Sequence, residues 1–185
     1  MTLHLNRLTI DVEQYYKMAE VGIIRPADRV ELIEGEVLTM SPINSPHASI
    51  VNALTEESVL QLAKKATIIV QNPLRINSNT EPEPDLIIAK YKKDKYAKAH
   101  PKPSDVHVVI EVADSSLQFD KTIKLPIYAK AGIPEYWIVN VDKKQIEQYT
   151  QPKGEEYLQK NTIRKKGKIV CTVIEFEIKG SEIFL

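Results

Sequence analysis

The strongest constraint on the fold is the apolar run at residues 106–112, Val-His-Val-Val-Ile-Glu-Val, which only His107 and Glu111 interrupt. A strand that is apolar at nearly every position, and not only at every second one, is typical of the centre of a sheet that is covered on both faces. We therefore expect a buried central strand, with Glu111 at a position where a charge is costly.

Helices and further strands are predicted on either side of this strand. A helix that begins at Pro46, with Ser45 as its cap, places His47 on the same face as the apolar side chains that follow. A second helix is predicted at residues 120–131, where Pro126 should kink it or delay its start. The other expected elements are a helix at 9–21 capped by Thr9, a hairpin at 29–40, strands at 67–71, 74–76, 84–88 and 136–141, and C-terminal hairpin strands at 145–150, 157–164 and 169–178.

This order predicts an α/β fold, in which a mixed central sheet carries a helix on each face. A chain of 185 residues without a repeat or a flexible linker favours one domain at residues 1–185. Within it we expect an N-terminal accessory helix and hairpin at 1–45, a core at 46–141 and a C-terminal β extension at 142–185.

Composition excludes several classes of protein. The single cysteine, Cys171, cannot form an internal disulfide, and no apolar run reaches the ~18 residues that a membrane span needs. We therefore expect a cytoplasmic protein with no membrane partner. The 25 basic and 25 acidic side chains balance, so any binding to nucleic acid must come from a local basic patch.

Two carboxylates are the first candidates for chemistry. Asp85 opens one predicted strand and Glu111 ends the next, so a sheet that pairs these strands brings both acids together. Mutual repulsion and poor solvation of such a pair favour a hard divalent cation such as Mg²⁺. The alternative is that each carboxylate pairs with a neighbouring lysine.

The wider sequence resembles a known family. Pro84-Asp85, followed by Glu111-Val112-Ala113 at the end of an apolar strand, is similar to the motif of PD-(D/E)XK nucleases. The chain from about Thr9 to Thr150 resembles the Uma-two-type family of restriction endonucleases. The fragments that carry this resemblance are residues 31–36, Pro46-His47, Pro84-Asp85, residues 109–117, Asp120, Lys124 and residues 128–139.

The resemblance implies a restriction-endonuclease-like core and DNA phosphodiester hydrolysis that depends on Mg²⁺ or Mn²⁺. Asp85 and Glu111 match the acidic metal ligands, and the backbone carbonyl of Val112 matches a third ligand. One position departs from the motif, because Ala113 stands where a lysine is expected. We expect Lys124, on the predicted helix at 120–131, to replace that lysine and to stabilise charge at the phosphate. Its alternative is a surface pair with Asp120.

Five further residues are weaker candidates, and two of them, His47 and Glu36, have a structural alternative. They are His47, which faces the core from the first long helix, Glu36 on the hairpin, Asp120 and Tyr128 on the helical face of Lys124, and Lys121, a rival for its role. A histidine on a core-facing stripe is more often a packed structural residue, and a glutamate on a hairpin edge often serves only to block strand pairing.

A lysine-rich segment at residues 90–102 joins the strands of the two carboxylates. Its lysines alternate with Tyr91 and Tyr96, a pattern that suits a nucleic-acid backbone, although an ordinary solvated loop has the same composition. The lysines that we expect to bind DNA near the metal ligands are Lys90, Lys92, Lys93 and Lys95.

The leading hypothesis is thus a Mg²⁺-dependent DNA endonuclease, for which the resemblance also implies a homodimer. The alternative is a catalytically inactive protein that keeps the fold and binds DNA or dimerises, which Ala113 would explain. No phosphate-binding Gly-x-x-x-x-Gly-Lys motif is present, so we expect no nucleotide cofactor.

Overall fold

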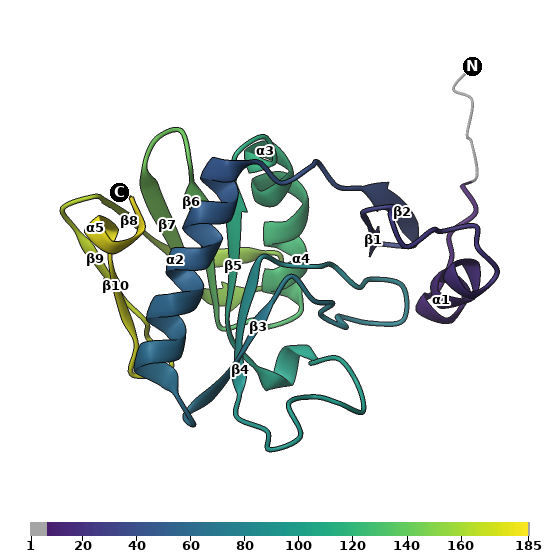
Figure 1. Cartoon of the computed structure of the whole chain (residues 1–185), viewed down its shortest axis with the longest axis horizontal. Helices are drawn as coiled ribbons and strands as arrows, with labels where there is room; N and C mark the ends of the chain where they lie inside the picture. The colour runs from purple at the N-terminus through teal and green to yellow at the C-terminus, as the bar shows by residue number, and fades with distance from the viewer. Residues whose placement is uncertain (1–6, 185) are drawn as a thin grey trace.

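The fold is built on a six-stranded mixed sheet with strand order β3-β4-β5-β6-β7-β8 (Figure 1). The structure is a computed structural model that describes residues 7–184. All neighbouring strands are antiparallel except β5 and β6, which run parallel. The strands are β3 (Ala66–Val70), β4 (Leu86–Lys90), β5 (Val106–Ala113), β6 (Glu135–Asn140), β7 (Gln145–Lys153) and β8 (Glu156–Arg164). The predicted central strand is confirmed as β5, which is buried from Val108 to Ala113.

Helices cover both faces of this sheet, as the α/β prediction required. The long helix α2 (Ser45–Leu62) lies across one face, where Ile50 and Leu54 join an apolar cluster with Ile110 and Trp137 (Figure 1). On the other face, α3 (Leu117–Phe119), a π-helical turn (Asp120–Lys124) and α4 (Leu125–Lys130) form the crossover between β5 and β6. Side chains buried under this crossover include Tyr128, Ile133 and Tyr136.

The helix at 120–131 differs from its prediction in a way that matters for function. A π-helical turn, Asp120–Lys124, lies between α3 and α4, and α-helical geometry resumes at Leu125, one residue before Pro126. Proline has no N–H and fits the first turn of a helix, so α4 starts where Pro126 tolerates it best. Wide turns of this kind occur often at functional sites.

Two helices begin at caps other than those predicted. Asp11, not Thr9, caps α1 (Val12–Glu20) through a reciprocal capping box with Gln14, and Asn44, not Ser45, caps α2 by accepting a hydrogen bond from the His47 amide. Aspartate and asparagine are strong N-cap residues, so α1 is capped two residues later, and α2 one residue earlier, than the pattern predicted.

The N-terminal elements form a module beside the sheet (Figure 1). It consists of α1 and the predicted hairpin, β1 (Val30–Ile33) and β2 (Glu36–Thr39), which turns at Glu34 and Gly35. The module is held by the segment before β4, where Leu32 forms a bridge with Glu81 and the Gly35 amide donates to the Asn79 carbonyl. Gly35 has φ of +83° and lies against Thr9, so a side chain there would collide with it.

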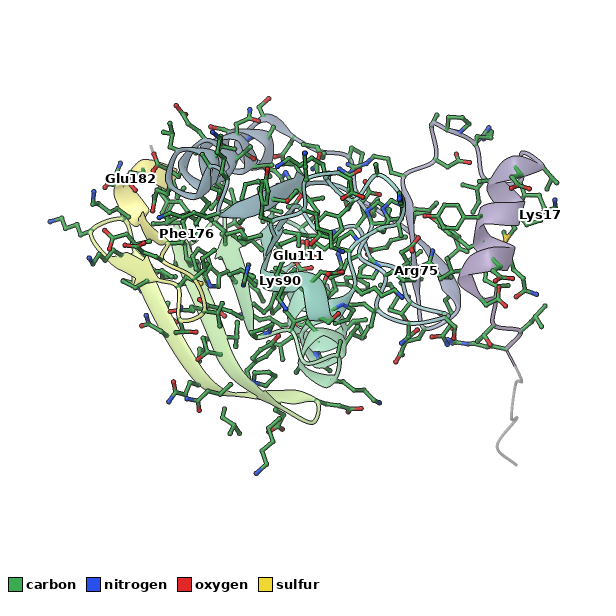
Figure 2. All side chains as sticks on the ribbon, turned by 90° about the horizontal axis from the view of Figure 1, so that it is seen from below. Lys17, Arg75, Lys90, Glu111, Phe176 and Glu182 are labelled. Carbon is green, nitrogen blue, oxygen red and sulfur yellow. The ribbon has the colours of Figure 1, made fainter. Side chains whose placement is uncertain are left out.

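The C-terminal segments divide between two sheets. The hairpin β7–β8 extends the central sheet, whereas β9 (Lys168–Val170) and β10 (Glu177–Lys179) form a separate pair next to α5 (Gly180–Ile183). Figure 2 shows this end, with Glu182, opposite the end that carries α1 and Lys17. The predicted strand at 74–76 is wrong, because these residues lie outside the strands, next to a tight turn closed by Asn77 and Thr80. No helix among residues 7–184 is long and apolar enough to cross a membrane.

Candidate active site

A pocket of about 450 Å³ lies where the carboxyl end of β5 meets the start of β4. Its walls come from β1, the segment between β2 and α2, the first turn of α2 and the π-helical turn. The acidic side chains that line it are Glu31, Glu83, Asp85, Glu111, Asp114 and Asp120, and the basic ones are Arg29, His47 and Lys124. The pocket therefore gathers most of the predicted catalytic residues in one place.

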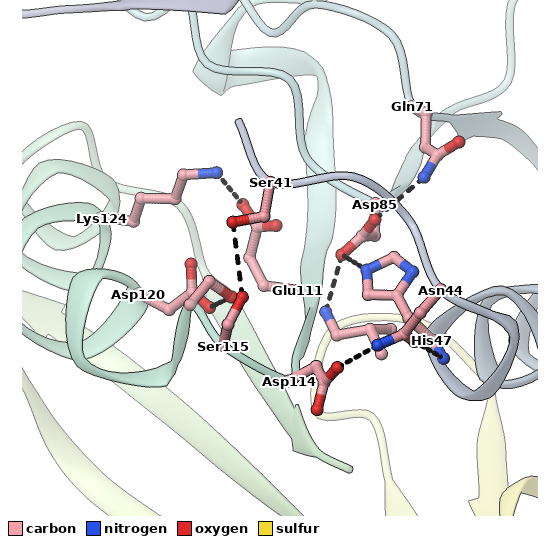
Figure 3. A network of polar contacts seen from close by, with 12 residues as sticks. Ser41, Asn44, His47, Gln71, Asp85, Glu111, Asp114, Ser115, Asp120 and Lys124 are labelled. Carbon is pink, nitrogen blue, oxygen red and sulfur yellow. Dashed lines mark hydrogen bonds and ion pairs between the residues drawn. The ribbon is translucent and has the colours of Figure 1, made fainter. Parts of the chain in front are cut away.

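Asp85 is fixed by three donors from three different elements (Figure 3). Its Oδ2 accepts hydrogen bonds from the Val112 amide at 2.8 Å and pairs with His47 Nε2 at 3.1 Å, while Gln71 Nε2 donates to Oδ1 at 3.2 Å. Burial raises the pKa of Asp85, but the His47 contact and the other bonds outweigh it, so the pKa lies below its usual value. Asp85 is thus a carboxylate at neutral pH, held in a fixed orientation.

Glu111 is buried and faces the opposite side of the pocket. Its Oε1 accepts hydrogen bonds from Lys124 Nζ at 3.0 Å and from the Tyr128 hydroxyl at 2.9 Å. Burial raises the pKa of Glu111 well above its ordinary value, and the nearby charges of Asp120, Asp85 and Glu31 raise it further, against the lowering effect of Lys124. The carboxyl group is therefore one that gains from an added positive charge.

Lys124 is the central cation of the site. It is buried in the π-helical turn, and its Nζ lies 3.0 Å from Glu111 and 3.1 Å from Glu31. Burial alone would lower the pKa of Lys124, but the carboxylates of Glu111, Glu31 and Asp120 raise it above its ordinary value. The ammonium group keeps its proton at neutral pH, so it can neutralise charge but cannot act as a general base.

A family model described as Uma2, "putative restriction endonuclease", matches residues 12–179. The chain belongs to this family. A crystal structure described as "a putative nuclease belonging to DUF820" from Anabaena variabilis superposes with a TM-score of 0.71 and 11% sequence identity, over 95% of this chain and 97% of that one. At this identity the likeness shows the fold, and no curated protein matches the chain in sequence.

Ala113 and Glu111 lie two residues apart on β5, and Lys124 reaches Glu111 from another element. Ala113 lies two residues after Glu111 on β5, and it is buried in the same apolar cluster as Tyr128. Lys124 approaches Glu111 from the helical crossover on that face of the sheet. Lys124 therefore brings its positive charge to Glu111 from the crossover and not from β5.

The sequence pattern missed Glu31, which is part of the site. Glu31 lies on β1, is 4% exposed, contacts Lys124, and accepts a hydrogen bond from the Glu83 amide at 3.2 Å. One signal in the sequence could have identified Glu31: it is a charged residue within an otherwise apolar short strand. Glu36, the candidate residue predicted on the same hairpin, lies away from the pocket. It pairs with Arg7 at 2.6 Å.

Other predicted residues also lie elsewhere. Lys121 points away from the pocket and pairs with Glu147 at 2.8 Å. The lysine-rich segment leaves β4 at Lys90, at the end opposite Asp85, and five residues of strand separate the two by roughly 17 Å. In that segment Lys92 pairs with Asp105 at 3.1 Å. The structure therefore does not bring these lysines next to the two carboxylates, and any contact they make with DNA is distant from them.

Asp120 lies in the pocket and has a perturbed acidity. It is 1% exposed, accepts a hydrogen bond from Ser116 Oγ at 2.6 Å, and burial raises its pKa to about 6. Because the folded-state pKa exceeds the usual 3.8, the folded protein binds this proton more tightly than the unfolded chain does. The stabilising effect of that proton is complete below pH 3.8 and is lost as the pH rises through about 6.

We therefore predict that Asp120→Asn stabilises the fold in a pH-dependent way. At pH 8 the free energy of unfolding of the variant should exceed that of the original chain by about 1–3 kcal/mol, because a tenfold change in proton affinity corresponds to about 1.4 kcal/mol. At pH 4 the two should be equal. Urea denaturation at both pH values measures this, and an identical difference at pH 4 and pH 8 would contradict the assignment of the raised pKa to Asp120.

The residues of the pocket fit a hard divalent cation by their chemistry. Mg²⁺ is commonly held by one or two carboxylates together with waters and substrate phosphate oxygens. Asp85 and Glu111 supply two carboxylates, in a pocket whose other acids raise the pKa of Glu111 by repulsion. Among residues 7–184, no group of three or more His, Cys, Asp and Glu side chains is arranged to hold a metal ion, so such a cation needs water or substrate ligands as well.

Proposed function

We propose that this protein is a Mg²⁺- or Mn²⁺-dependent DNA endonuclease that acts as a homodimer. The observation that carries the proposal is the placement of Lys124 at 3.0 Å from Glu111, in the pocket that also holds the ionised Asp85. The nuclease motif that the sequence resembles uses two acids and a lysine, and the proposal is supported by the presence of Asp85, Glu111 and Lys124 in the lining of one pocket.

Asp85, Glu111 and the Val112 carbonyl are the groups that would hold the cation. A divalent ion there would polarise a phosphate oxygen and lower the pKa of a bound water. His47, Gln71 and the Val112 amide keep Asp85 in one orientation, which reduces the reorganisation that binding requires.

Lys124 acts electrostatically in this proposal. Its proton is held by Glu111 and Glu31, so the ammonium group presents a fixed positive charge at the pocket. A preorganised charge of this kind stabilises the negative charge that develops on the phosphate in the transition state. Tyr128 holds the same Glu111 oxygen and keeps the carboxylate from turning away.

A second function is favoured by the two ion pairs of Lys124. Lys124 already pairs with two carboxylates, and a lysine so engaged suits a structural ion pair as well as a catalytic group. In that case the protein keeps the nuclease fold and binds DNA or dimerises without cleaving it.

Cleavage of supercoiled plasmid DNA by the purified protein distinguishes the two functions. We expect nicked and linear products in the presence of about 5 mM Mg²⁺ or Mn²⁺. We expect none with EDTA, because the acids need a cation to act. DNA binding in a gel-shift assay without cleavage under any metal would favour the inactive protein. Light scattering on the same sample tests the homodimer.

A further inference from the structure

The segment at residues 40–44, here called the strap, crosses one side of the candidate active site. It connects β2 to α2, and all five of its residues line the pocket that contains Asp85 and Glu111. Two side-chain contacts tie it to the residues that follow β5: Asn44 Nδ2 donates to Asp114 Oδ2, and Ser115 Oγ donates to Ser41 Oγ at 3.4 Å (Figure 3). The strap therefore forms a wall of the pocket that is fastened at both ends.

With the strap in this position the pocket has the size of a small-ligand site. Its 450 Å³ equals a cube with edges of roughly 8 Å, within the usual range of about 300–1,000 Å³ for small-molecule pockets. A base pair of a duplex is larger than a single nucleotide, because it adds a second base with its own sugar and phosphate. A nucleotide separated from its partner strand suits this space, whereas a stacked base pair does not.

The lining of the pocket also suits one nucleotide. The carboxylates and Lys124 give the pocket its charged lining, and Phe119 with Met40, Pro42 and Ile43 of the strap adds apolar surface. A base has an apolar face that stacks on aromatic or apolar side chains, and its phosphate needs the charged groups. The pocket thus offers both kinds of surface within one cavity of about 450 Å³.

We infer that the site selects DNA in which the nucleotide at the scissile phosphate is unpaired, as in a single strand or a locally opened duplex, and that the strap enforces this choice. The inference rests on the proposed nuclease function. Ser41, Pro42, Ile43 and Asn44 are all exposed, so little buried surface holds the strap, and the contact between Asn44 and Asp114 acts as its latch.

The latch can be broken and restored by a charge swap. Asn44→Asp keeps an N-cap oxygen for α2 but replaces the donor that faces Asp114 by a second carboxylate, which repels it. Asp114→Asn added to that variant returns a donor and an acceptor in reversed positions. Asn52→Asp, on an exposed position of α2, is the matched control for the added charge.

The experiment measures cleavage of one oligonucleotide sequence as a single strand, as a perfect duplex and as a duplex with one unpaired nucleotide. We expect the original chain and Asn52→Asp to cut the two unpaired forms at least about 10-fold faster than the perfect duplex. Asn44→Asp should reduce this ratio several-fold, and the Asn44→Asp/Asp114→Asn double variant should restore it.

Phe119→Ala should slow cleavage of the unpaired forms by about 10-fold through lost stacking. Binding of the same three DNA forms with Ca²⁺, followed by fluorescence anisotropy, should show the same order.

Two contrary results are distinguishable. Equal cleavage of paired and unpaired DNA, with no change in the strap variants, overturns the inference and leaves the nuclease function standing. No cleavage and no binding of any form overturns both. Thermal unfolding of each variant shows that a lost preference is not a lost fold, and the double variant supplies the same check within the activity data.

Discussion

Asp85→Asn should lower the rate of DNA cleavage by about 100- to 1,000-fold and should abolish metal binding, with little change in the fold. The asparagine side chain keeps an oxygen for the Val112 amide, so the local geometry survives. It loses the negative charge, which is the main attraction for a divalent cation at this position. Removal of a group that stabilises charge in the transition state has effects of this size in other enzymes.

The measurement pairs plasmid cleavage with isothermal calorimetry of Mn²⁺ binding. Asp94→Asn is the matched control, because Asp94 lies in the exposed segment beyond the far end of β4 and should leave both readouts unchanged. Full cleavage by Asp85→Asn at the same metal concentration would remove Asp85 from the catalytic site.

Lys124→Met should have the largest effect on stability. It removes the cation that lies between Glu31 and Glu111 and leaves both buried carboxyl groups without it, which typically costs about 3–5 kcal/mol. Cleavage should also be lost, since methionine fills the space but carries no charge. Lys121→Met, three residues earlier, should cost much less, because Glu147 retains Lys160 as a second partner at 2.9 Å.

The cost of Lys124→Met should depend on pH. Burial already raises the pKa of Glu111 above its ordinary value, and the loss of the Lys124 charge raises it further. A carboxyl group whose pKa is higher in the folded state favours folding when protonated, so its destabilising effect is small below about pH 4.5 and grows as the pH rises through the folded-state pKa. Urea unfolding at pH 5 and pH 8 should show the larger loss at pH 8. A loss of equal size at both values would place the damage in packing and not in charge.

The sequence predicted the central sheet and the presence of both acids in one region of the fold for a clear physical reason. The apolar run of β5 can be buried only in the middle of a covered sheet, and strand pairing then places Asp85, which precedes β4, beside Val112. The helical spacing of Lys124 and Tyr128 was also informative, since both contact Glu111.

The remainder of the site depends on contacts that sequence spacing does not encode. Glu31 reaches Lys124 because the N-terminal module docks on the segment before β4, through contacts between residues far apart in the chain. The lysine-rich segment was placed near the acids because it joins their strands. The segment, however, leaves β4 at its last residue, Lys90, whereas Asp85 precedes its first residue.

The π-helical turn was equally hidden from the sequence. Pro126 predicted an irregular helix. A kink, a delayed start and a widened turn can each accommodate the hydrogen bond that proline cannot donate. Only the packing of the crossover against β5 decides among them, because it must bring Lys124 to Glu111.

The most direct test of the account is a crystal structure of the protein grown with Mn²⁺, with anomalous difference density calculated at the manganese edge. The account predicts a peak in the pocket that is bound by both Asp85 and Glu111, with the Val112 carbonyl as a further ligand and Lys124 still nearby. A pocket without such a peak at saturating Mn²⁺, in which Lys124 remains the partner of Glu111 and His47 that of Asp85, would contradict it.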